Sequence, residues 1–326
     1  MSKKRKKKIK LKKYRNLIIS VSLFAMFAIC FGGLYMWEQM EPEEQTEVGA
    51  KPSQGVASEQ YQPIETEPQI TLPEFEARRI NFLLVGRDAH GEGENGRSDS
   101  MILCSMDTGT KSVTMISFLR DIYLKIPGHG SNRLNAAYSW GGRELLIETL
   151  QENFGIEVDV CLEIDFEGFR DLIEALGGVD VELTAEEAEH LNKNNGWSLS
   201  EGVNHLNGRQ ALSYSRIRYL DSDFGRTERQ RNVLTALLYK YRSATLQEML
   251  SVTDTFLELS ESDHSDEELL GYALELYTTL GEADLTTHRV PADGTYTYET
   301  INGMSVVDVD FEKNRELIEE WLAGAS

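Results

Sequence analysis

The chain has 326 residues, of which 40% are hydrophobic and 27% charged, and its formal net charge is −21. This hydrophobic content excludes a wholly disordered protein and is enough to build one large core or two ordinary ones. The charge is unevenly distributed, because residues 1–16 carry ten Lys or Arg and no acid, whereas the chain beyond residue 37 has 23 basic and 54 acidic residues. That asymmetry is typical of a basic tail at a membrane.

Residues 17–37, LIISVSLFAMFAICFGGLYMW, contain no charge. As a helix they would span about 32 Å at roughly 1.5 Å per residue, which is enough for one transmembrane pass. A cleaved signal peptide is the alternative, but its apolar region would be shorter and would end in small residues rather than in Tyr35 and Trp37. The basic tail predicts a cytoplasmic N-terminus at the cell membrane and an extracytoplasmic location for the rest of the chain.

Residues 38–72 hold four prolines and eight acids, which predicts a solvated linker. From residue 73 to residue 326 the pattern becomes globular, with neither a convincing internal repeat nor a second linker. We therefore expect one extracytoplasmic domain over residues 73–326.

Strands and helices alternate along the first part of this domain. INFLLV (80–85) predicts a buried strand, and SMILCSM and SVTMISFL predict a hairpin around the turn DTGTK. The next expected elements are a helix from about Asn135 to Gly155, a strand near 157–164, a helix that ends at Gly177-Gly178 and the strand VDVEL. The remaining ones are helices at about 208–218, 226–243, 245–260 and 265–280, strands in DLTTHRV and GMSVVDVD, and a helix over 311–323. This order predicts a single layered α/β domain with a central mixed sheet flanked by helices.

Two features carry little functional information. Gly91, Gly93 and Gly96 match the dinucleotide-binding pattern G-x-G-x-x-G, but a strand-like run follows them where that site needs a helix. Cys104 and Cys161 lie in strand-like apolar runs, which favours buried free thiols, although an oxidising compartment leaves a disulfide possible.

Asp88 and Asp99 flank the glycine-rich loop, one at the end of a predicted strand and the other at the start of the next. If the two strands are neighbours, both carboxylates lie at one edge of the sheet. Such a pair suits Mg²⁺, which prefers oxygen ligands and often shares them with substrate phosphate. The alternative is that each aspartate only closes a turn.

The stretch SRIRYLDSDFGRTERQR, residues 215–231, is rich in arginine although the chain around it is acidic. Arg216 and Arg218 end one predicted helix, and Arg226, Arg229 and Gln230 recur at i, i+3 and i+4 on the next, where they can line one face near a helix N-terminus. Every basic residue from 209 to 231 is arginine, whose rigid fork binds phosphate in a bidentate way. The alternative is a solvated face balanced by Asp221, Asp223 and Glu228.

Arginines and a divalent ion together would stabilise the charge of a phosphoryl group in transfer. Arg120 and Asp121 at a strand end and Arg133 near a helix start add charged candidates. The chain has no Ser–His–Asp order, catalytic cysteine pattern or H-E-x-x-H motif, so we expect direct displacement rather than covalent catalysis.

Seven blocks, taken in order, resemble the successive motifs of the LytR-CpsA-Psr family: NFLLVGRD, GRSDSM, ISFLRDIYLKIPG, RLNAAYSWGG, LIEALGGVDVEL, LNGRQALSYSRIR and DFGRTERQRNVL. The resemblance covers about residues 79–310. It implies a phosphotransferase that moves a glycopolymer, such as teichoic acid or capsular polysaccharide, from an undecaprenyl-pyrophosphate carrier to peptidoglycan at the membrane, with Mg²⁺ or Mn²⁺ as cofactor and no nucleic acid partner. A non-catalytic module that binds polyprenyl pyrophosphate or the wall is one alternative. A transcriptional attenuator is another, although DNA binding would then rest on the basic tail alone.

The resemblance also implies roles for individual residues. Asp88 and Asp99 fall on the metal-associated positions, and Asp223 falls on an acidic position before the second helix. The positions around the pyrophosphate are Arg97, Arg120, Arg133, Arg216, Arg218, Arg226 and Gln230. Of these, Arg120, Arg218 and Arg226 are expected to act in catalysis, and the acceptor is expected to be a hydroxyl of N-acetylmuramic acid. Asp121 or Asp99 would deprotonate it, although a metal-bound Asp99 would be a poor base. Arg133 stands where the family commonly has lysine.

Overall fold

The computed structural model describes residues 75–88, 96–218 and 220–324, all of which belong to one compact unit, Ile70–Ser326. The predicted basic tail, transmembrane helix and linker lie outside the described residues. Among the helices of these ranges, none combines the length and the apolar character that crossing a bilayer would require.

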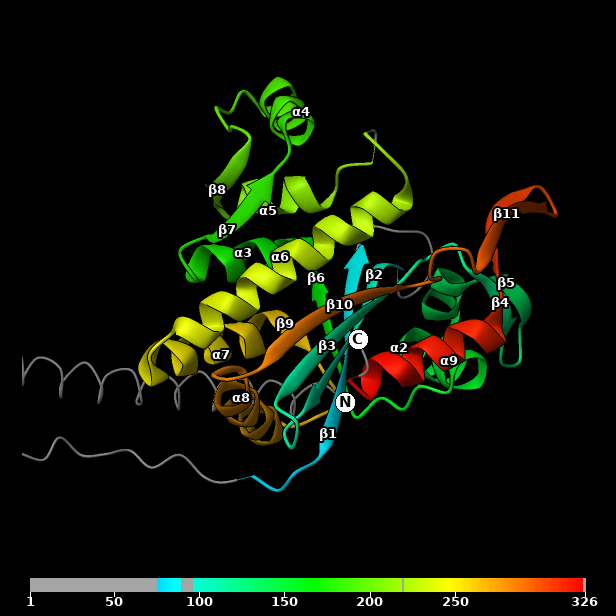
Figure 1. The fold of residues 1–326 in the computed structure, drawn as a ribbon, viewed down its shortest axis with the longest axis horizontal. Coiled ribbons are helices and arrows are strands. Elements are labelled where there is room, and N and C mark those ends of the chain that lie inside the picture. Colours follow the sequence, from blue (N-terminus) through cyan, green and yellow to red (C-terminus); the bar gives the residue numbers. More distant parts are fainter. Residues whose placement is uncertain (1–74, 89–95, 219, 325–326) are drawn as a thin grey trace, which may run out of the picture. The chain divides into compact units, whose positions relative to one another are not determined.

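A six-stranded mixed sheet forms the centre of the unit (Figure 1). In spatial order its strands are β10 (Asp284–Val290), β3 (Ser112–Phe118), β2 (Arg97–Asp107), β1 (Arg79–Asp88), β6 (Val160–Asp165) and β9 (Ser260–Glu261). The pairs β1–β2, β2–β3 and β6–β9 are antiparallel, and β3–β10 and β1–β6 are parallel. The predicted α/β class and the central mixed sheet are confirmed.

Helices cover both faces of this sheet. The helices of the described residues are α2 (Leu134–Phe154), α3 (Phe166–Ala175), α4 (Ala185–Asn195), α5 (Gly208–Ser215), α6 (Asp223–Ser243), α7 (Leu246–Leu259), α8 (Asp266–Leu280) and α9 (Phe311–Leu322). Alternate residues of β1 point to opposite faces, so Leu83 and Val85 join a core with α2 and α9, while Phe82 joins another with α6 and α8.

Three two-stranded sheets complete the unit: β4 (Tyr123–Ile126) with β5 (Gly130–Arg133), β7 (Val179–Leu183) with β8 (Gly202–Leu206), and β11 (Tyr296–Ile301) with β12 (Met304–Val309). The segment VDVEL was expected to continue the alternating sheet, but it forms β7 and pairs only with β8. Its buried valines pack instead on α4, α5 and α6 in a third apolar cluster. The elements α4, β4, β5, β8, β9 and β11 were not predicted.

Cys104 and Cys161 are both buried and unpaired, as the apolar runs around them indicated. They lie on opposite faces of the sheet, because Cys104 is opposite Phe82 in the ladder and Cys161 is opposite Leu83. Burial raises the pKa of each thiol to about 12, so neither is suited to act as a nucleophile.

Candidate functional site

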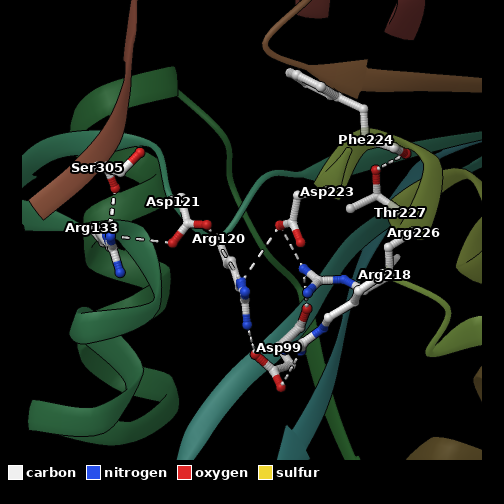
Figure 2. A network of polar contacts seen from close by, with 10 residues as sticks. All are labelled: Asp99, Arg120, Asp121, Arg133, Arg218, Asp223, Phe224, Arg226, Thr227 and Ser305. Carbon is white, nitrogen blue, oxygen red and sulfur yellow. Dashed lines mark hydrogen bonds and ion pairs between the residues drawn. The ribbon is translucent and has the colours of Figure 1, made fainter. Parts of the chain in front are cut away.

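Three arginines from separate segments meet at one end of the central sheet (Figure 2). Arg120 follows β3, Arg218 follows α5, and Arg226 lies near the start of α6. Asp99 of β2 lies between the first two. Arg120 donates from Nη1 to Asp99 Oδ1 at 2.6 Å, and Arg218 donates from Nη2 to Asp99 Oδ2 at 3.1 Å. The structure thus brings together all three arginines that the sequence assigned to catalysis.

A β-bulge sets the position of Asp99. Gly86 of β1 is opposite Ser100 and Arg87 is opposite Ser98, so Asp99 is the extra residue of β2 at this point. Bulges of this kind often re-aim a side chain beside an active site. Burial alone would raise the pKa of Asp99, but the hydrogen bond from Arg120 and the nearby arginine charges outweigh it and hold that pKa below its ordinary value.

Arg226 is the most deeply buried charge of the site, with 1% of its side chain exposed. Its Nη2 contacts Asp223 Oδ2 at 2.7 Å, but its Nε and Nη1 are buried without a hydrogen-bond partner. Burial lowers the pKa of the guanidinium to about 10, so it still carries its charge near neutral pH. Buried donors without partners are costly, and an anionic ligand would satisfy them.

Asp223 joins the arginines from above (Figure 2). Its Oδ2 lies 3.5 Å from Arg120 Nε as well as near Arg226. Burial raises the pKa of Asp223, and the attraction of Arg226 and Arg120 offsets only part of that shift. The resemblance to the family motifs placed Asp223 on an acidic position before the second helix but gave it no chemical role. The structure shows it in contact with two of the site arginines.

The start of α6 adds a partial positive charge. The helix begins at Asp223 rather than at the predicted residue 226, and its N-cap Ser222 makes no side-chain hydrogen bond to the first turn. The free N–H groups and the helix dipole at this end favour an anion.

Arg229 does not belong to the site, although the i, i+3, i+4 pattern put it on one face with Arg226 and Gln230. Its Nε contacts Glu187 of α4 at 2.6 Å and its Nη2 contacts Asp221 at 2.5 Å. Both contacts hold the buried guanidinium of Arg229 outside the network around Asp99. The prediction that Arg229 lines the same face of the helix as Arg226 is therefore wrong.

Arg216 and Arg218 lie after α5, which ends at Ser215, and not on the last turn of a helix as predicted. The chain leaves the helix because Ile217 between them is buried in the apolar cluster of α4 to α6. Both arginines are therefore exposed, and Arg216 lies over the ring of Phe166 at 4.3 Å.

An apolar cleft opens beside the arginines, between the sheet and helices α3, α6 and α7. Its first part has a cavity volume of about 140 Å³, with Ser100, Arg216 and Gln230 among its few polar lining residues. A second part of about 190 Å³ extends toward α8. Both parts share the lining residues Leu84, Leu162, Leu172, Leu234, Leu237 and Phe256. Protein cores are normally close-packed, so open space with an apolar lining suits a hydrocarbon ligand.

The other predicted residues lie at the edges of the site. Asp121 contacts Arg120 Nε at 3.6 Å and Arg133 Nε at 3.4 Å. Arg133 also donates to the carbonyl of Ser305 in β12, so its guanidinium lies between Asp121 and that strand. Arg97 starts β2 and is exposed, opposite Asp88 at the end of β1.

Asp88 and Asp99 offer carboxylate oxygens, which are the ligands that Mg²⁺ prefers. Within the described ranges no three His, Cys, Asp or Glu side chains gather as a metal cluster. Mg²⁺, however, often uses only one or two carboxylates and takes its other ligands from water and substrate phosphate. Asp88 and Asp99 lie at neighbouring strand ends and could be the two carboxylate ligands of such an ion. Arg120 and Arg218, which now donate to Asp99, would then donate to the bound phosphate instead.

Comparison with known proteins identifies the relatives of this chain. Residues 47–321 match the LytR_cpsA_psr family. The chain belongs to the LytR-CpsA-Psr family. Among characterised members, it is 31% identical to the regulatory protein MsrR of Staphylococcus aureus over 75% of this chain and 74% of MsrR. It is 35% identical to the polyisoprenyl-teichoic acid–peptidoglycan teichoic acid transferase TagU of Bacillus cereus, over 56% of this chain and 59% of TagU.

Solved structures share the fold. The structure of TagT bound to LIIa-WTA superposes with a TM-score of 0.65 at 26% identity, over 78% of this chain and 94% of TagT. The crystal structure of Bacillus subtilis TagV gives a TM-score of 0.63 at 29% identity, over 76% of this chain and 99% of TagV. The relatives of this LytR-CpsA-Psr protein therefore include both a named regulator and named transferases.

Proposed function

We propose that this protein is a membrane-anchored phosphotransferase that moves a glycopolymer from a polyprenyl-pyrophosphate carrier to peptidoglycan outside the cell. The observation that carries the proposal is a long apolar cleft that ends at Ser100, Arg216 and Gln230, close in the chain to Asp99, Arg218 and Arg226. A donor with a diphosphate head and a polyprenyl tail needs both features side by side. The names of TagU and TagV, both teichoic acid transferases, support the same reaction class.

The cleft and the arginines divide the donor between them. The polyprenyl chain would lie along the shared aliphatic wall of the cleft, with its phosphate end at Arg216 and Gln230. The diphosphate would then reach Arg218 and Arg226, and the Nε and Nη1 of Arg226, which have no hydrogen-bond partner, would donate to its oxygens. Bidentate arginine contacts in a partly buried site both hold the diphosphate and stabilise the charge that develops on it during transfer.

The reaction follows from this placement as a direct displacement. The oxygen of a peptidoglycan sugar hydroxyl attacks the phosphorus that carries the glycopolymer, and a new P–O bond forms. The bond from that phosphorus to the bridging oxygen of the diphosphate breaks, and polyprenyl phosphate leaves with the electron pair. The hydroxyl proton passes to a carboxylate of the site, and a phosphodiester joins the two polymers.

The geometry favours Asp223 or Asp121 over Asp99 as the proton acceptor. Asp99 accepts hydrogen bonds from two arginines and its pKa is lowered, so its proton affinity is weak. Burial raises the pKa of Asp223, which strengthens it as a base. When bound by Asp88 and Asp99, Mg²⁺ or Mn²⁺ would supply additional positive charge to the phosphates.

The test uses the full chain in detergent micelles, a short polyprenyl-pyrophosphate-linked oligosaccharide and peptidoglycan glycan fragments. We expect a phosphodiester-linked product and release of polyprenyl phosphate, detected by mass spectrometry. Tight donor binding without turnover would instead identify a binding module, and release of phosphate products without a linked polymer would identify a pyrophosphatase. Either result would overturn the proposed transfer.

A further inference from the structure

A series of aromatic rings leads from the start of α6 out along β11. The ring centroids of Phe224 and Tyr296 are 4.9 Å apart, and those of Tyr296 and Tyr298 are 5.8 Å apart. Phe224 directly follows Asp223, and Arg289 lies over its ring with Cζ 4.2 Å from the ring centroid. The series therefore begins at the arginine site and ends at Tyr298.

Tyr298 is 61% exposed although it lies on the side of the hairpin that faces the protein. Its ladder partner is Val307, which is 2% exposed and bridges to Ile122 beside Asp121. The pKa of the Tyr298 hydroxyl is raised, first by burial and then by its neighbours, which include Asp223 and Asp121. Because cross-strand partners share a face, the exposed ring lies on the same face of the hairpin as Val307, whose backbone is hydrogen-bonded to the segment that carries Asp121.

The hairpin is fixed to the site by hydrogen bonds to the backbone of β12. Val307 N donates to the carbonyl of Asp121 at 2.9 Å, and Arg133 Nε donates to the carbonyl of Ser305 at 3.1 Å (Figure 2). Tyr298 is thus held in a set position relative to Asp121. A single exposed tyrosine on a protein surface needs no explanation. A ring that is held near the segment of Asp121 and contacts a second aromatic ring edge-to-face does.

We propose that Tyr298 forms a platform for a sugar ring of the acceptor glycan, with Tyr296 set edge-to-face against it as a support. Asp121 and Asp223 would then face the hydroxyl groups of the sugar. Sugar rings present apolar C–H faces and polar edges, and tyrosine combines an apolar ring with a polar tip in the same way. The inference rests on the proposed phosphotransfer and identifies where its second substrate binds.

The position of the hairpin distinguishes acceptor from donor. The cleft reaches the site at Ser100, Arg216 and Gln230, and no residue of β11 or β12 lines it. A chain of contacts leads from Ser305 through Arg133, Asp121, Arg120 and Asp99 to Arg218, so β12 and Arg218 lie at opposite ends of this network (Figure 2). The cleft belongs to the Arg218 end, because its lining residues Ser100 and Arg216 are close in the chain to Asp99 and Arg218. In an in-line displacement the attacking and leaving oxygens are on opposite sides of the phosphorus. The leaving polyprenyl phosphate belongs in the cleft, so the attacking sugar belongs on the hairpin side.

The experiment compares the full chain with Tyr298→Ala, Tyr298→Trp and the control Tyr239→Ala, which removes a ring that is 52% exposed on α6. For Tyr298→Ala we expect the KM for a peptidoglycan tetrasaccharide to rise by about three- to tenfold, with donor affinity unchanged. Tyr298→Trp should retain most of the affinity, and Tyr239→Ala should behave as the unmodified protein.

Direct binding of the tetrasaccharide, followed by NMR titration, separates this inference from the reaction itself. If the protein binds the tetrasaccharide and Tyr298→Ala weakens that binding, the platform stands even where no transfer product forms. Equal affinity in both proteins, or no measurable binding to either, would overturn it. An equal loss of donor and acceptor affinity would also overturn it, because the ring would then contact the donor.

Discussion

Arg226 and Arg229 lie one turn apart on α6, yet their surroundings are opposite in kind. Arg229 is a saturated buried cation, held by Glu187 at 2.6 Å and by Asp221 at 2.5 Å. Arg226 is equally buried but has one close carboxylate, at 2.7 Å, and two buried nitrogen atoms without a partner. A cation whose donors are all satisfied stabilises a fold, whereas one with donors left over is prepared for a ligand.

The largest effect should fall on the saturated arginine. Arg229→Ala leaves Glu187 as a buried carboxylate without its partner, so we expect the free energy of unfolding to fall by about 3–5 kcal/mol. Chemical denaturation of the full chain measures this loss. The double variant Arg229→Met with Glu187→Leu should recover much of it. A loss below about 1 kcal/mol would show that the pair is not a structural element.

Arg226 should respond in activity rather than in stability. Arg226→Ala removes a stabilising charge from the diphosphate, and we expect transfer to slow by about 10²- to 10³-fold. Its free energy of unfolding should fall by less than that of Arg229→Ala, because the removed cation is incompletely satisfied and Asp223 keeps its contact with Arg120. Arg209→Ala is the control, since Arg209 lies over Trp197 with no contact to the site. Transfer near the unmodified rate in Arg226→Ala would remove this residue from the mechanism.

The pH dependence of the transfer rate tests Asp223, the first residue of α6, as the general base. A base acts in its deprotonated form, so the transfer rate should increase as pH rises through the pKa of Asp223. Burial raises that pKa, and the increase should therefore occur at higher pH than for an exposed carboxylate, whose pKa is about 3.9. Asp223→Asn should lower the maximal rate by about 10²-fold and flatten this limb of the profile. If Asp121→Asn has that effect instead, the base is Asp121.

A smaller effect separates two helical glycines. A Cβ at position 225 would lie 2.1 Å from Asp221 Oδ2. Gly225→Ala therefore forces the Asp221 carboxylate to move, which disturbs its ion pair with Arg229. We expect a destabilisation of about 1–3 kcal/mol in chemical denaturation. Gly271→Ala in α8 meets no atom within 4 Å and should stabilise by about 0.5–1 kcal/mol. Equal effects of the two variants would show that Asp221 moves away without cost.

Sequence patterns predicted the central sheet and the long helices, because buried strands and amphipathic helices leave strong periodic signals. The resemblance to the LytR-CpsA-Psr motifs placed Asp99, Arg120, Arg218 and Arg226 around one site, where the structure brings them together. Sequence patterns did not separate Arg226 from Arg229. Asp221 was considered only as part of a solvated face, and Glu187, the other partner of Arg229, is distant in the sequence. The helix that carries Glu187 had a signal that was not used, because Thr184 and Glu187 form a capping box.

The hairpin of β11 and β12 had a signal as well. Asn302 and Gly303 both have positive φ, and an Asn-Gly pair between strand-like runs is a strong indication of a two-residue turn. The Thr and Tyr alternation of TYTYETI then gives β11. That Tyr298 borders Asp121 could not be read from the sequence, because the contact depends on how β12 docks beside β4.

The central claim is that Arg120, Arg218 and Arg226 hold the diphosphate of a donor whose hydrocarbon lies in the adjoining cleft. A crystal structure of the protein with geranylgeranyl pyrophosphate tests it directly. We predict diphosphate oxygens within hydrogen-bond distance of Arg218 and of Nε or Nη1 of Arg226, and the isoprenoid chain against Leu84, Leu162 and Leu234. A diphosphate bound elsewhere, or a cleft that stays closed to the chain while the diphosphate binds, would contradict the account.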